Sequence, residues 1–141
     1  MRRASLVLAS LALLLFAGHR VADANKTHEA TLTGAAETGG GDPDGSGFSL
    51  VNMSPGGNEI CFTIDVSGIA PATAASLHKG AAGTDGPVVA TLTAPTSGTT
   101  IGCVAVNQEL LKDLLKHPES YYVNVYNEEY PNGALRGQLT H

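Results

Sequence analysis

The sequence has few basic residues. Its 141 residues include 8 Lys and Arg against 13 Asp and Glu, which gives a formal net charge of −5 at pH 7. Nucleic acids and anionic membrane surfaces attract proteins through clustered cations, whereas the Lys and Arg residues of this chain are scattered. We therefore expect neither nucleic acid nor an anionic membrane surface to be a partner.

Long apolar runs are also missing after the first 24 residues. The chain begins MRR, continues with an apolar stretch over residues 5–17, and reaches Ala22-Asp23-Ala24, a small-residue pattern typical of signal-peptide cleavage. The apolar stretch is shorter than the ~20 residues that span a bilayer. We predict a secretory signal peptide over residues 1–24 and a single secreted or periplasmic domain over residues 25–141. The alternative is an uncleaved membrane anchor.

Cysteine is rare, since only Cys61 and Cys103 are present. An even number of cysteines in an exported chain favours a disulfide, because the compartment is oxidising. A disulfide between Cys61 and Cys103 would close a loop of about forty residues, which stabilises a fold by roughly 4 kcal/mol in the chain-entropy model, less any strain. Two buried thiols in a reducing compartment are the alternative.

Catalytic motifs are missing as well. Neither Ser46 nor Ser97 lies in a G-x-S-x-G turn, and no Gly-Lys-Ser follows the glycines at 39–41. The segment Asp42-Pro43-Asp44-Gly45 begins like a calcium loop but lacks the closing glutamate. The sequence therefore favours a binding module over an enzyme.

Short β-prone runs separated by Gly- and Pro-rich turns dominate the chain. The clearest run is 59–66, in which Ile60, Phe62, Ile64 and Val66 alternate with polar residues and are expected to face the core. Similar runs cover 29–35, 48–53, 74–78, 88–93 and 101–106. This spacing predicts an all-β fold, an antiparallel β-sandwich or barrel.

One short helix is expected between the strands. Asn107 can cap its start, and Pro118 ends it. An apolar stripe at helical spacing is made by Leu110, Leu111, Leu114 and Leu115. We expect a crossover helix packed over one end of the sheets, with a partner-binding helix as the alternative.

The last predicted hairpin, 121–139, carries the candidate site. In its first strand Tyr121, Val123 and Val125 alternate with polar residues, and a turn follows at 130–133. In the returning strand Leu135, Gly137 and Leu139 share the apolar face. The opposite face and the turn supply our candidate ligand-binding residues, Tyr122, Asn124, Tyr126, Tyr130 and Arg136.

Four segments resemble the chordin-type (CHRD) domain family. They are Leu32–Glu37 (LTGAAE), Leu77–Val89 (LHKGAAGTDGPVV), Tyr122–Val125 (YVNV) and Tyr130–Leu139 (YPNGALRGQL). The resemblance implies an immunoglobulin-like or Greek-key β domain. Such domains occur in chordin, a secreted antagonist of bone morphogenetic proteins, and in many exported microbial proteins of unknown activity.

The family's histidines are mostly replaced in this chain. Its H-x-H pattern is similar to that of copper/zinc superoxide dismutases, but Ser76 stands at the first histidine and Tyr126 at a third, which leaves His78. The other histidines after the predicted signal peptide, His28, His117 and His141, are expected at a terminus or a helix end, without ligand spacing. A metal site needs two to four converging ligands, so we expect no cofactor; copper or zinc at His78 is the alternative.

We expect Arg136 to pair with a carboxylate, such as Glu37, or to stack on a tyrosine. The leading hypothesis for the whole chain is a non-enzymatic exported module that binds an extracellular or envelope protein or a surface polymer. The alternative is a degenerate copper/zinc-binding protein with a superoxide-dismutase-like site.

Overall fold

Antiparallel strands make up most of the regular secondary structure in the computed structural model, which describes residues 26–54 and 56–141. The strands are β1 (Lys26–Thr33), β2 (Ser46–Ser54), β3 (Glu59–Ser67), β4 (Ala74–Lys79), β5 (Val88–Leu92), β6 (Thr99–Ala105), β7 (Tyr121–Tyr126) and β8 (Leu135–Gln138). A helix, α1 (Gln108–Lys116), and a 3-10 turn, η1 (Pro118–Ser120), lie between β6 and β7. The predicted signal peptide lies outside the described residues.

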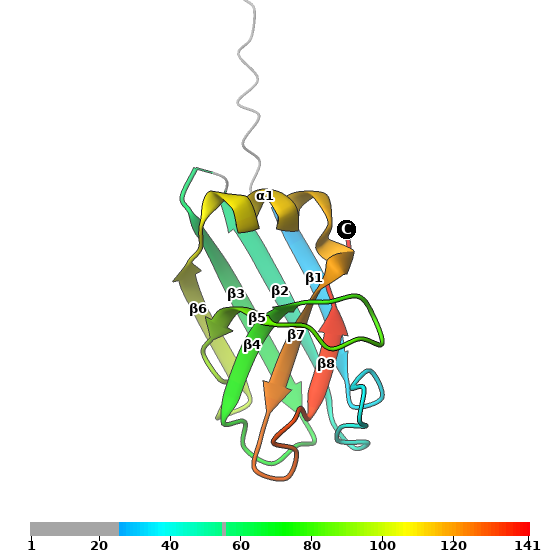
Figure 1. Ribbon diagram of the computed structural model, residues 1–141. Coiled ribbons are helices and arrows are strands. Elements are labelled where there is room, and N and C mark those ends of the chain that lie inside the picture. The colour runs from blue at the N-terminus through cyan, green and yellow to red at the C-terminus, as the bar shows by residue number, and fades with distance from the viewer. Residues whose placement is uncertain (1–25, 55) are drawn as a thin grey trace, which may run out of the picture.

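The strands form one sheet that folds over into two layers. Its order is β5-β4-β7-β8-β1-β2-β3-β6. Figure 1 shows β5, β4, β7 and β8 in front of β1, β2, β3 and β6. The layers join where β8 meets β1, through the pair Thr33–Arg136 and a bridge between Glu29 and Thr140. The expected all-β fold, a sandwich or barrel, is therefore confirmed as a nearly closed, barrel-like sheet.

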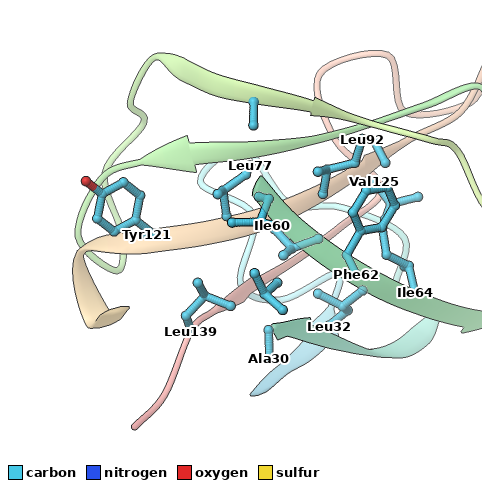
Figure 2. Packing of buried hydrophobic residues seen from close by; sticks show 14 of the residues in the cluster. Ala30, Leu32, Ile60, Phe62, Ile64, Leu77, Leu92, Tyr121, Val125 and Leu139 are labelled. Atoms are coloured by element: carbon cyan, nitrogen blue, oxygen red, sulfur yellow. The ribbon is translucent and has the colours of Figure 1, made fainter. Parts of the chain in front are cut away.

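The core lies between the two layers and is built from every second residue of the strands. Ile60, Phe62 and Ile64 of β3 point toward Leu77 of β4 and Val125 of β7 (Figure 2). Alternate side chains of a strand point to opposite faces, so the alternation in residues 59–66 places these three residues inside.

Helix α1 lies across one end of the two layers (Figure 1). The side chain of Asn107 accepts a hydrogen bond from the backbone N–H of Leu110 at 2.8 Å, as expected for a cap. Leu111 and Leu114 are buried in the core. The helix thus carries the chain from β6 in one layer to β7 in the other, as a crossover helix does. None of the helices in the described part of the chain is long and apolar enough to cross a membrane.

The two cysteines form the predicted disulfide. Cys61 of β3 lies directly opposite Cys103 of β6, with 2.07 Å between the sulfurs and 4.0 Å between the Cα atoms. Cys103 is exposed and Cys61 is half-buried. The bond therefore lies on the outer face and ties the edge strand β6 to its neighbour.

The first strand differs from its expected position. The sequence pattern predicted a run over residues 29–35, but β1 begins at Lys26 and ends at Thr33. His28 therefore lies within a strand and is buried, so the expectation that it lies at a terminus is wrong. Ala30 and Leu32 point into the core. Because every second residue of a strand faces the same side, His28 points into the core as well.

Candidate binding cleft

The polar faces of β4, β7 and β8 form one continuous surface. Ser76 pairs with Asn124, which pairs with Arg136, and His78 pairs with Tyr122 in the adjacent row. As the alternation predicted, these side chains point away from the core. This surface is nevertheless buried, because the segments 34–45 and 80–87 lie over it: Tyr122 is 2%, Asn124 4% and Arg136 1% exposed.

The ring of Tyr122 is held between two other side chains. The His78 ring stacks on it from β4, with centroids 4.7 Å apart and planes 9° apart. The guanidinium carbon of Arg136, on β8, lies 3.5 Å from its centroid. The backbone N–H of Gly86 donates to its hydroxyl at 3.1 Å. Tyr122 therefore anchors the segment 80–87 as well as forming part of the cleft.

Both ring nitrogens of His78 have protein partners. Nδ1 lies 2.8 Å from the carbonyl oxygen of Gly86, which can only accept, so Nδ1 carries a proton. In the neutral ring Nε2 therefore accepts from the hydroxyl of Tyr126, 2.7 Å away. Burial raises the pKa of Tyr126, and the neighbouring Tyr122, Glu37 and Asp85 add to this effect. The Tyr126 hydroxyl is thus kept protonated as a donor.

The described residues do not assemble a ligand set around His78. The one group in residues 26–54 and 56–141 with three potential metal-binding atoms close together is Glu59, Cys61 and Cys103, and both of these cysteines are in the disulfide. Histidine 78 is thus built into the structure as a hydrogen-bonded residue, with a phenol where the family pattern places a third histidine.

Arg136 meets both expectations, stacking and a carboxylate partner, but that partner is Asp85 and not Glu37. Its Nη2 donates to the carbonyl of Ala81 at 3.0 Å and to Gln138 at 3.2 Å. Its Nη1 lies 3.5 Å from a carboxylate oxygen of Asp85. Arg136 therefore fastens the segment 80–87 to β8.

Glu37 is the functional candidate that the sequence reasoning did not single out. It lies in the segment after β1, is 8% exposed, and accepts a hydrogen bond from Asn124 at 2.7 Å. Burial raises its pKa from 4.5 to about 7, although Asn124 and Arg136 act in the opposite direction. Gly133 has φ +133°, and a Cβ there would lie 2.4 Å from Glu37 Oε2. Glu37 closes the segment LTGAAE of the family resemblance, which was the signal available in the sequence.

A cleft of about 550 Å³ opens between these segments and the turn of the last hairpin. Its floor and walls include Glu37, His78, Tyr122, Asn124, Tyr126 and Tyr130, with Asp85 and Glu129 also lining it. Four of the five residues expected to bind a ligand thus line one cleft. Arg136 does not line it, because it lies behind the ring of Tyr122.

The other three histidines in the described residues lie near one another at the opposite end of the last strand. The rings of His28 and His141 are 6.0 Å apart, and Nδ1 of His28 lies 2.6 Å from the carbonyl oxygen of Thr140. His141 and His117 each approach one oxygen of Glu119, at 3.2 and 3.6 Å. These contacts do not involve the cleft.

The fold and cleft define a small antiparallel β module with a polar cleft lined by tyrosines. The chain matches the model of the CHRD domain over residues 28–139 and therefore belongs to the CHRD domain family. Neither the curated proteins nor the solved structures contain a match to this chain.

Proposed function

We propose that this protein is an exported binding module and that its cleft takes one unit of a surface polymer. The observation that carries the proposal is the convergence of Tyr126, Tyr130 and the Glu37–Asn124 pair on one cleft. Rings supply contact area at a low cost in conformational entropy, while amide and carboxylate groups orient hydroxyl-bearing or charged units.

The surroundings of the cleft favour a polymer over a protein partner. The core of a protein interface is apolar and wide, with about 800 Å² buried on each partner. The large apolar residues exposed in the described part of the chain are Phe48, Val88 and Ile101, and none of them lines the cleft. The segment 38–40, which borders it, is Thr-Gly-Gly.

Export is supported by two features of the chain. The predicted signal peptide precedes the domain, and the Cys61–Cys103 bond on the outer face suits an oxidising compartment. The alternative function, a copper/zinc site at His78, gains no support from the geometry, because both ring nitrogens are hydrogen-bonded within the protein.

Binding to a panel of soluble polymers tests the proposal. The full chain, exported by its expression host, is titrated with neutral, amine-bearing and acidic polysaccharides in a calorimeter. We expect binding to at least one of them and a loss of about ten-fold in affinity in Tyr130→Ala, because stacking on the ring is removed. Ile101→Ala is the control, since Ile101 is exposed on β6, away from the cleft.

No binding to any polymer would contradict the proposal. So would a stoichiometric protein partner whose affinity falls in Tyr130→Ala but not in Ile101→Ala, because the cleft would then be part of a protein interface.

A further inference from the structure

The charges along the cleft are of one sign. Three carboxylates line it, from Glu37, Asp85 and Glu129, and no lysine is among the described residues that do so. Arg136 offsets part of this charge, because its Nη1 lies 3.5 Å from a carboxylate oxygen of Asp85, but its guanidinium lies against Tyr122 and does not line the cleft. A ligand in the cleft therefore meets a negative field.

One oxygen of Glu37 has no hydrogen-bond partner in the described structure. Oε1 accepts from Asn124, whose amide also donates to the carbonyl of Leu135 at 3.1 Å, so both of its protons are used. The hydroxyl proton of Tyr126 is directed to His78. Glu37 as a residue is 8% exposed. A buried carboxylate costs free energy unless it is paired, and Oε2 is left for a ligand.

Two aromatic rings line the same cleft as this carboxylate. Tyr126 and Tyr130 both line the cleft and are half-buried, so each exposes part of its ring to a ligand. The face of an aromatic ring attracts a cation within about 6 Å of its centroid, and the attraction increases when the cation is desolvated. Rings that share a cleft with a buried carboxylate are therefore a suitable receptor for a positively charged nitrogen.

We propose that the unit bound in the cleft carries a cationic nitrogen, such as the ammonium group of an amino sugar, and that this group pairs with Oε2 of Glu37. This inference rests on the proposed function, since it specifies the chemistry of the polymer unit that the same cleft takes.

The inference predicts how binding depends on pH. Asn124, Arg136 and Asp85 act on the charge of Glu37, and it acts on that of Tyr126. The other titratable groups that line the cleft are His78, Tyr122, Glu129 and Tyr130. The pKa of Glu37 is about 7, so at pH 5.5 its carboxyl group is mostly protonated and offers no negative charge. A cation that pairs with it binds more tightly as the pH rises, and binding releases a proton.

A matched pair of ligands tests the inference. The probes are β-1,4-linked glucose tetramers carrying either aminoethyl or hydroxyethyl groups, which are similar in size and differ in charge. An alkylammonium group stays protonated at pH 8, as lysine does. We expect the aminoethyl tetramer to bind the full-length protein at least ten-fold more tightly at pH 8, and this preference to fall about ten-fold at pH 5.5.

Two variants distinguish the effect of the Glu37 charge from that of the protein's overall negative charge. Glu37→Gln keeps an acceptor for Asn124 but removes the charge, and we expect it to abolish both the preference and its pH dependence. Glu128→Gln removes an exposed charge that does not line the cleft, and we expect it to retain both.

Equal binding of the two tetramers to the wild-type protein would overturn the proposal that the ligand is cationic. The proposal of a polymer-binding module would remain. Binding of neither tetramer, together with no binding to the polymer panel, would overturn both proposals. A preference that persists in Glu37→Gln would also overturn the inference, because Glu37 would then not be the paired group.

Discussion

At the scale of single residues, the cleft combines groups that stabilise the fold with one that does not. Tyr122 is packed between His78 and Arg136, which orders the segment 80–87 over the sheet. Glu37 is different, because its carboxylate is buried without a cationic partner in contact. Buried charged groups without an oppositely charged partner are common where a ligand supplies that partner.

Replacing Glu37 by glutamine should make the protein more stable at alkaline pH. The folded pKa of about 7 lies above the ordinary value of 4.5, so the folded state holds its proton more tightly than the unfolded state. The stability that this proton provides is present below pH 4.5 and is lost as the pH rises through 7. We expect the advantage of Glu37→Gln in urea unfolding to grow by on the order of 2 kcal/mol from pH 5 to pH 8. An advantage that does not vary with pH would contradict this prediction, and Glu128→Gln is the control.

Replacing Arg136 by lysine should destabilise the fold by about 1–3 kcal/mol, because an ammonium group neither stacks on Tyr122 nor keeps the same directed hydrogen bonds. Thermal or urea unfolding measures this loss. Asp85→Asn tests the ion pair separately; because Asp85 is exposed, we expect a change within about 0.5 kcal/mol. An unchanged transition in Arg136→Lys would show that the stacked guanidinium does not stabilise the segment 80–87.

At the scale of secondary-structure elements, side-chain contacts and the disulfide hold helix α1 and the edge strand β6 against the rest of the sheet. Asp113 of α1 accepts a hydrogen bond from the hydroxyl of Tyr121 on β7 and pairs with Lys79 of β4 at 2.7 Å. The edge strand β6 is tied to β3 by the disulfide. These contacts hold the helix and the edge strand in place without contributing to the cleft.

Removing the disulfide should lower stability without changing the fold. The bond joins residues separated by 42 positions, and opening it returns conformational freedom mainly to the unfolded chain. We expect a Cys61→Ala, Cys103→Ala double variant to lose about 2–4 kcal/mol in urea unfolding with its far-ultraviolet circular dichroism unchanged. Reductant should weaken the wild type but not the variant. Equal stability of the two proteins in the absence of reductant would contradict the prediction.

At the scale of the whole molecule, the cleft exists because segments distant in the sequence meet on one face. Glu37, His78 and the last hairpin, with Asn124 and Tyr130, come from three different parts of the chain and line one opening. The order β4-β7-β8-β1 brings them together, since β1 follows β8 in the sheet although it comes first in the sequence.

The same arrangement leads to a prediction about metals. Protein purified without chelator should carry much less than one equivalent of copper or zinc by elemental analysis, because both nitrogens of His78 are hydrogen-bonded. One equivalent that is lost in His78→Ala would contradict this prediction. A Ser76→His, Tyr126→His double variant adds imidazoles near His78 and removes its phenol donor, so we expect it to gain measurable affinity for both metals.

The sequence alone determined which side chains face the core and where several elements begin or end. Alternation placed Ile60, Phe62 and Ile64 inside, Asn107 capped the helix, and export predicted the disulfide. The first two features depend on local geometry, and the disulfide was expected from two cysteines and a predicted signal peptide, so each can be read from the sequence.

Only the tertiary structure decided what covers the other face of β4, β7 and β8. Alternation showed that Tyr122, Asn124 and Arg136 point away from the core, but not that the segments 34–45 and 80–87 bury them. The partner of Asn124 is Glu37, 87 positions away, and the partner of His78 is Tyr126, 48 positions away. Loop conformation and strand order set these distances, and neither has a periodic signature in the sequence.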